Sequence, residues 1–214
     1  MRQFKYVPKT EWQPERNQVV DVIHEVQDLL RDDFTFSFEF IGSSHRNMIA
    51  REVNGNRGYD FDVDIRVNDE EEEFGPEELK HMLIDALNHV ACKYGYSPCE
   101  DSTRVITLKK KDNLNSRILF SCDFAIINDY DDKKGNPHQQ YVYFNKSETE
   151  YTWRERSKEY CGLKDKENRI KVAGKWKRVR EVYLNKKRQF SYEKKSRALY
   201  AETINEVFSN LGVS

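Results

Sequence analysis

The chain has 214 residues, with 36 Lys and Arg against 37 Asp and Glu and a formal net charge of −1. Hydrophobic residues make up 37% and aromatic residues 13%, which is enough for a packed core and excludes wholesale disorder. No apolar run reaches the roughly 18 residues that a membrane span needs, and the first residues (MRQFKYVPKTEW) lack an apolar signal region, so we expect a soluble cytoplasmic protein without a membrane partner.

The spacing of apolar residues and the turn signals predict helices and strands in a mixed order. In chain order we expect helix 13–31, strand 34–43, strand 59–67, helix 76–91, strands 103–111, 116–127 and 140–145, and helices 174–188 and 193–211. This order predicts an α/β (α+β) fold with a mixed, antiparallel-rich sheet, flanking helices and a helical C-terminal portion. We place a core at residues 1–150 and a basic helical portion, packed on it, at residues 151–214.

Charge is strongly separated along the chain. From Asp60 to Glu78 there are ten acidic residues against Arg66 alone, whereas from Arg154 to Arg197 there are seventeen basic residues against six acidic ones. Separation on this scale predicts a cation site in one half of the protein and a surface that faces a polyanion in the other.

Three carboxylates alternate along the strand predicted in 58-GYDFDVDIRV-67. Successive side chains of a strand point to opposite faces, so Asp60, Asp62 and Asp64 share one face. Like charges held side by side repel one another and are costly to bury, which indicates that a cation belongs between them. Asp123 is a further, isolated carboxylate in an otherwise apolar strand (RILFSCDFAII).

The segments 41-IGSS-44, 58-GYDFDVDIRV-67 and 121-SCDFAII-127 together resemble the DNA polymerase beta-type nucleotidyltransferase superfamily, over residues 13–145. That family's pattern is Gly-Ser after a hydrophobic residue, then two carboxylates at alternate positions of a strand, then a third Asp on a neighbouring strand. The helical tail is similar, more loosely, to that of oligoadenylate and cyclic dinucleotide synthases. One departure is the sixteen residues between Ser43 and Asp60, a longer separation than the family usually has.

The resemblance implies transfer of a nucleoside monophosphate from ATP or another nucleoside triphosphate to a hydroxyl acceptor, with release of pyrophosphate. It implies that Asp60, Asp62 and Asp123 are catalytic and hold two Mg²⁺ or Mn²⁺ ions. Because three Asp residues alternate, Asp62 and Asp64 form an alternative metal-binding pair. The family's phosphate-binding turn falls on Gly42, Ser43 and Ser44. The acceptor stays open between a nucleotide, an RNA and a protein hydroxyl.

The C-terminal portion offers further candidates for nucleotide binding. Lys177 or Arg178 could reach the triphosphate from the predicted helix 174–188, in which Trp176, Val179, Val182 and Tyr183 form an apolar stripe. Tyr192 or Tyr200 could stack on the nucleobase, although packing is the commoner role of a tyrosine.

Two alternatives remain beside this prediction. One is a non-catalytic RNA- or nucleotide-binding protein that uses the basic tail, with stacking aromatic residues among the bases: Trp153, Tyr160, Trp176 and Tyr183. This alternative gives no role to the carboxylates of Asp60, Asp62 and Asp123. The other is a transferase that adenylylates a partner protein, against which the long basic tail counts.

Overall fold

The computed structural model describes residues 2–69, 73–156 and 162–211. The chain forms two compact units, each built from separate segments. The sheet unit comprises Val7–Ile49 and Asn56–Arg156. The helical unit comprises the described residues of Met1–Tyr6, Ala50–Gly55 and Ser157–Ser214. The domain boundary at residue 150 stays a prediction, and Tyr160 lies outside the described residues.

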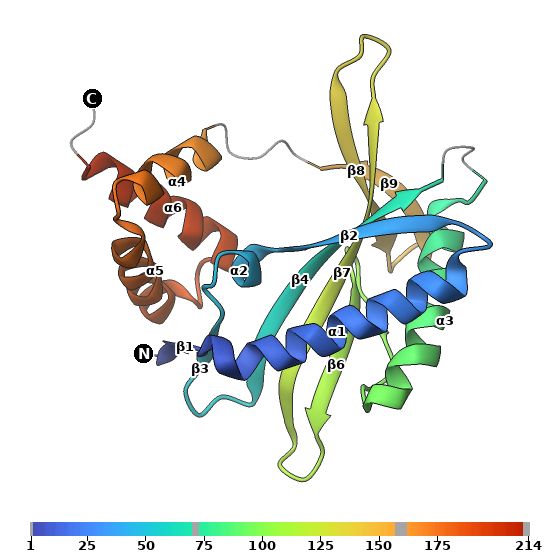
Figure 1. Ribbon diagram of the computed structural model, residues 1–214, viewed down its shortest axis with the longest axis horizontal. Coiled ribbons are helices and arrows are strands. Elements are labelled where there is room, and N and C mark those ends of the chain that lie inside the picture. The colour runs from blue at the N-terminus through green and yellow to red at the C-terminus, as the bar shows by residue number, and fades with distance from the viewer. Residues whose placement is uncertain (1, 70–72, 157–161, 212–214) are drawn as a thin grey trace. The chain divides into compact units, whose positions relative to one another are not determined.

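A mixed sheet forms the centre of the sheet unit (Figure 1). Its strands are β2 (Thr35–Ile41), β4 (Arg57–Asn68), β5 (Glu100–Asp101), β6 (Ile106–Asp112), β7 (Arg117–Asp131), β8 (Pro137–Asn145) and β9 (Glu150–Glu155). The strand order is β2-β4-β7-β6-β5, while β8 pairs with the second half of β7 and with β9. Among these described strands, β4 and β7 pair in parallel and all other pairs are antiparallel.

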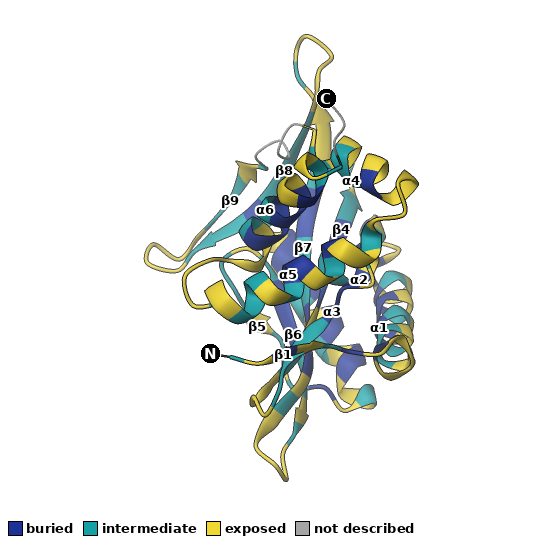
Figure 2. Ribbon diagram, turned by 90° about the vertical axis from the view of Figure 1, so that its left-hand side faces the viewer, coloured by how far each residue is buried: buried dark blue, intermediate teal, exposed yellow. Residues whose placement is uncertain are grey.

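Two helices, α1 (Lys9–Leu30) and α3 (Pro76–Ala91), cover one face of this sheet (Figure 1). A short 3-10 helix, η1 (Cys92–Tyr94), follows α3. The strands alternate as the sequence predicts, so that Phe61, Val63 and Ile65 of β4 are at most 1% exposed and join the core beneath the helices. The middle of β4 and β7 is accordingly buried, whereas the tip of the β7–β8 hairpin is exposed (Figure 2).

The helical unit contains a small two-stranded sheet and three helices. Its elements are β1 (Phe4–Tyr6), β3 (Ala50–Glu52), α4 (Leu163–Val172), α5 (Trp176–Phe190) and α6 (Ser196–Ser209). The hydroxyl of Tyr6 donates to the carbonyl of Arg180 at 2.7 Å, and the guanidinium of Arg188 donates to the carbonyl of Phe4 at 2.9 and 3.1 Å. These bonds fasten β1 to α5 across almost the whole length of the chain.

The fold class predicted from the sequence is confirmed, but several boundaries differ. Helix α1 begins at Lys9 instead of residue 13, with Trp12 buried at 5% exposure and Pro14 inside the helix. A proline so near the start removes only one hydrogen bond of the helix, to the carbonyl of Thr10. The strands β1, β3 and β9 and the helix α4 were not predicted. In the described parts of the chain, no helix is both long enough and apolar enough to span a membrane.

Candidate active site

Asp62 and Asp123 lie opposite one another on the adjacent parallel strands β4 and β7. Their Cα atoms are register partners, and Asp60 faces Ser121 in the same way. Gly58 brings the two strands together at this point, because a Cβ atom there would collide with the carbonyl of Leu119. Pairing the two segments that the sequence singles out therefore places Asp60, Asp62 and Asp123 on the sheet face that α1 and α3 leave uncovered.

The turn after β2 packs directly against Asp62. Ile41, the last residue of β2, is the register partner of Asp62, and Gly42 follows it with φ +65° at the start of the short helix α2 (Gly42–His45). A Cβ atom on Gly42 would overlap the carboxylate of Asp62. Glycine is thus needed twice here, for its left-handed backbone and for the space that the carboxylate occupies.

The two serines of this turn differ in their surroundings. The hydroxyl of Ser44 donates to the carbonyl of Ile41 at 3.0 Å, and the residue is 7% exposed. The backbone carbonyl of Ser43 accepts from the N–H of Met48 at 2.8 Å. Ser44 therefore shapes the turn, whereas Ser43 is only half-buried. Phosphate binding by Gly42, Ser43 and Ser44 stays a prediction.

Asp123 is held by a residue that the sequence did not single out. The hydroxyl of Thr107, on β6, donates to Oδ1 of Asp123 at 2.7 Å, and Thr107 is 8% exposed. Burial raises the pKa of Asp123, against the hydrogen bond from Thr107 and the charge of Lys109, which lower it. Only the register of β6 on β7 makes this contact, and a threonine inside a predicted strand gives no signal of it.

Among the carboxyl groups of the site, Asp62 has the most strongly shifted pKa. Burial raises the pKa of Asp62 to about 6, and the charges of Asp123, Asp60 and Asp64 act in the same direction while Arg46 opposes them. Asp60 is exposed and accepts a hydrogen bond from the hydroxyl of Ser121. The repulsion inferred from alternating carboxylates is therefore present, and it falls chiefly on the central one.

Asp64 is engaged elsewhere. Its two carboxylate oxygens accept from Nη1 and Nη2 of Arg156 at 2.6 and 3.1 Å, and Asp64 is 3% exposed. Arg156 also donates to the side chain of Gln139, and Gln139 donates to Asp129. Asp64 lies one alternate position further along β4 than Asp62, and its carboxylate already has a basic partner in Arg156. This favours Asp60 and Asp62 as the metal pair, and the choice between the two pairs stays a prediction.

The donor set suits a hard divalent cation. Asp60, Asp62 and Asp123 offer only carboxylate oxygens, the ligands that Mg²⁺ and Mn²⁺ prefer, and their shared negative charge is what a cation would relieve. Over the described ranges, no three His, Cys, Asp or Glu side chains converge closely enough to hold an ion as they stand. Metal binding by these three carboxylates stays a prediction.

The remaining predicted site residues lie in the helical unit. Lys177 and Arg178 are exposed on α5, where Nη1 of Arg178 lies 3.5 Å from Oε2 of Glu181. Their approach to the carboxylates stays a prediction. Tyr200 is buried, with its ring edge-on to Tyr183, so it packs the unit; Tyr192 is 70% exposed beneath the guanidinium of Arg2.

Comparison with known proteins identifies the fold. No family model matches the sequence, and no curated protein matches it significantly. The chain resembles a CdnE c-di-GMP synthase from Capnocytophaga granulosa (TM-score 0.60, 17% identity, 94% of this chain and 61% of that one). It also resembles a CdnE cyclic dinucleotide synthase from Elizabethkingia meningoseptica, solved with GTP and Apcpp (0.52, 15%, 89% and 68%).

A third solved structure is similar, the DncV cyclic AMP-GMP synthase of Vibrio cholerae (TM-score 0.55, 16% identity, 98% of this chain and 55% of that one). The chain therefore spans between 55% and 68% of the length of these three synthases. Similarity at this level of identity shows a shared fold. It confirms the resemblance to nucleotidyltransferases that the sequence predicts, over more of the chain than residues 13–145.

Proposed function

We propose that this chain, which has the fold of the nucleotidyltransferases, transfers a nucleoside monophosphate from a nucleoside triphosphate to a hydroxyl group and releases pyrophosphate. The observation that carries the proposal is the in-register pair of Asp62 and Asp123, with the Gly42 turn packed against Asp62. A fold alone does not select a function. A half-buried pair of repelling carboxylates beside a glycine turn is costly in a structure without a use for it.

The site residues take separate roles in this reaction. Asp60 and Asp62 would hold the cation that accompanies the triphosphate, and the Gly42-Ser43 turn would face the phosphates with backbone N–H groups. Asp123, fixed at one oxygen by Thr107, faces the acceptor hydroxyl. When bound, Mg²⁺ or Mn²⁺ supplies the neutralisation of charge that phosphoryl transfer needs.

The acceptor oxygen forms a bond to the α-phosphorus as the bond from that phosphorus to pyrophosphate breaks. The proton of the hydroxyl has to leave, and the carboxylate of Asp123 accepts it.

A second nucleotide is the acceptor to test first. The similar structures are named as synthases of cyclic dinucleotides, in which one nucleotide supplies the hydroxyl for another. The chain spans only part of their length, so this acceptor belongs to the proposal.

Incubation with mixed nucleoside triphosphates and Mg²⁺ or Mn²⁺, with and without RNA, followed by mass spectrometry of the products, tests the proposal. We expect pyrophosphate release and a product heavier by one nucleoside monophosphate. Asp62→Asn should lower turnover by several orders of magnitude while the protein stays folded. An absence of turnover with every triphosphate and acceptor, or an Asp62→Asn variant as active as the wild type, would overturn it.

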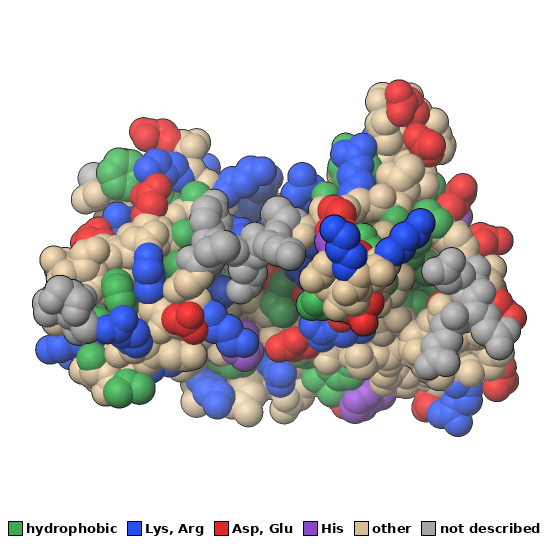
Figure 3. All heavy atoms as spheres, turned by 90° about the horizontal axis from the view of Figure 1, so that it is seen from above, with side chains coloured by type: hydrophobic (Ala, Val, Ile, Leu, Met, Phe, Trp, Pro, Cys, Tyr) green, Lys and Arg blue, Asp and Glu red, His purple; other side chains and the backbone are tan. Residues whose placement is uncertain are grey.

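RNA binding without catalysis stays the alternative, and a steep fall of RNA affinity with salt would support it. On the face seen in Figure 3, Lys and Arg side chains are interspersed with Asp and Glu side chains. One of the proposed stacking residues is also packed, because Tyr183 is buried in the helical unit. These observations favour the transferase.

A further inference from the structure

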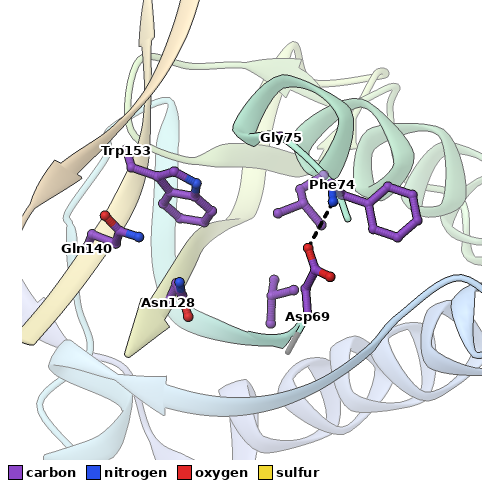
Figure 4. A pocket seen from close by; sticks show the side chains of 8 residues that line it. Asp69, Phe74, Gly75, Asn128, Gln140 and Trp153 are labelled. Atoms are coloured by element: carbon purple, nitrogen blue, oxygen red, sulfur yellow. Dashed lines mark hydrogen bonds between the residues drawn. The ribbon is translucent and has the colours of Figure 1, made fainter. Parts of the chain in front are cut away.

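A cavity of about 300 Å³ opens in the sheet unit between the start of α3 and the strands β7, β8 and β9 (Figure 4). Its apolar wall includes Val67 and Leu79. Its polar side is formed by Asn128 of β7, Gln140 of β8 and Trp153 of β9, whose side chains point into the space (Figure 4). Cavities that bind small molecules combine such an apolar wall with a few converging polar groups.

The cavity lies on the opposite face of the sheet from the carboxylates. Side chains alternate along a strand, so Val67 shares the face of Val63, which is buried beneath the helices. Asn128 likewise shares the face of Phe124, whereas Asp123 points the other way. A molecule in the cavity is therefore separated from Asp62 by the sheet itself, and it is not the reacting substrate.

Three side chains that line this cavity can donate or accept hydrogen bonds but form none with the part of the chain that the structure describes. Within the described residues, the side-chain amides of Asn128 and Gln140 and the indole N–H of Trp153 make no hydrogen bond to the protein. Asn128 and Gln140 are register partners on β7 and β8, so their amides lie side by side. Two neighbouring amides offer donors and acceptors together, and an indole offers a flat apolar face.

We propose that this cavity binds the base of a neutral nucleoside. Trp153 provides the stacking surface, and the amides of Asn128 and Gln140 bond the edge of the base, where a donor lies beside an acceptor. Asn and Gln are the side chains that pair with such an edge in adenine, and stacking on an aromatic ring accepts any base. This proposal does not depend on the transferase activity.

The charge around the cavity selects a neutral ligand. Asp69 lines it, and both of its oxygens are already bonded, at 3.0 Å each, to the N–H groups of Glu73 and Phe74. The N–H of Gly75, at the start of α3, donates to the carboxylate of Glu78 at 2.9 Å. A phosphate would meet carboxylates here and find this N–H already taken. The cavity therefore favours a nucleoside over a nucleotide.

Calorimetric titration of the whole protein with adenosine, guanosine, cytidine and uridine, and with ribose as a control without a base, tests the proposal. We expect at least one nucleoside to bind and ribose not to bind. A saturating non-hydrolysable ATP analogue with Mg²⁺ should not displace the nucleoside, because the triphosphate is excluded from the cavity. Asp62→Asn should bind the nucleoside as the wild type does, whatever becomes of its turnover.

Trp153→Leu and Asn128→Leu should each weaken nucleoside binding by about tenfold or more, as the loss of a stacking ring or of a paired edge predicts. Thr152→Ala is the matched control, since Thr152 is the neighbour of Trp153 on β9 and points to the other face; its affinity should be unchanged. Circular dichroism and melting temperature check that each variant is folded. If Trp153→Leu does not fold, the loss in Asn128→Leu decides, and Trp153→Phe, which keeps a ring, should retain nucleoside binding. Absence of binding by all four nucleosides, equal affinity in the wild type and these variants, or displacement by the ATP analogue would each overturn the proposal.

Discussion

Asp62 shows how a functional carboxylate works against the stability of its own protein. Burial raises its pKa from 3.8 to about 6, so the folded protein holds a proton that the unfolded chain releases. Between these two values the folded state binds more protons, and its stability falls as the pH rises. At neutral pH, without a cation, the ionised carboxylate is a net cost.

We therefore expect that, in EDTA, the free energy of unfolding of the wild type decreases between about pH 4 and pH 6 relative to that of Asp62→Asn. At neutral pH Asp62→Asn should melt at a higher temperature than the wild type. Denaturant unfolding across this pH range measures both effects. Asp60→Asn, at an exposed position, is the control and should change little. A less stable Asp62→Asn at neutral pH would contradict the assignment.

Gly42 sets the position of that carboxylate. Gly42→Ala should lower turnover by about a hundredfold, because the new methyl group overlaps the Asp62 carboxylate and a displacement of about 1 Å has effects of that size. Gly135→Ala is a matched control: Gly135 also has a left-handed backbone, with φ +76°, but nothing lies within 4 Å of the added Cβ. Steady-state kinetics measures turnover of the two variants, and Gly135→Ala, in the exposed hairpin between β7 and β8, should keep the wild-type rate. Equal losses of turnover in both variants would contradict the role assigned to Gly42.

At the scale of elements, one polar network joins strands that are distant in sequence. Asp64 of β4 pairs with Arg156, which follows β9; Gln139 of β8 bonds Arg156 and Asp129 of β7; Asp129 pairs with Arg66 of β4. The network therefore begins and ends on β4, at Asp64 and Arg66. It holds the end of β9 against the strand that carries Asp60 and Asp62.

The network predicts opposite effects on stability and turnover for Asp64 and Asp60, two aspartates of β4. Asp64→Ala leaves a partly buried arginine without its partner and should cost about 3 kcal/mol of stability, with a smaller effect on turnover. Asp60→Ala, at an exposed site, should change stability by less than about 0.5 kcal/mol and lower turnover by orders of magnitude. Urea denaturation and steady-state rates measure the two. The reverse pattern would move the metal pair to Asp62 and Asp64.

Sequence patterns located the elements that have strong internal periodicity. The helix from Pro76 to Ala91 is confirmed to the residue, because a proline at its first position and an amphipathic face mark it. Strand β1 has three residues, too few for a period to show, and it forms only because β3 pairs with it. Strand β9 follows a turn in a charged stretch and exists through its pairing with β8.

The residues of the candidate site also differ in whether the sequence alone marks them. Asp60, Asp62 and Asp123 carry a local signal, which is a charge in an apolar strand. Thr107 and Arg156 carry none, because their roles come from the register of β6 on β7 and from a contact across 92 residues. Partners set by tertiary pairing are invisible in a sequence read alone.

At the scale of the whole molecule, the chain leaves the helical unit after Tyr6 and re-enters it at Ala50 and again in the C-terminal portion. The change of composition near residue 150 predicts a single division of the chain there. A unit assembled from three separated segments has no such signature, since each segment is too short to show its partners.

That assembly has a consequence for the order of events during synthesis. Phe4 and Arg188 bond across 184 residues, and Tyr6 and Arg180 across 174. At about 5–20 residues per second, a ribosome needs roughly 10–40 s between making the first partner and the second. Throughout this interval the aromatic rings of Phe4 and Tyr6 lack the helix α5, against which β1 packs in the folded protein. The helical unit therefore cannot close until α5 has been made, and β1 lacks its partner on that helix until then.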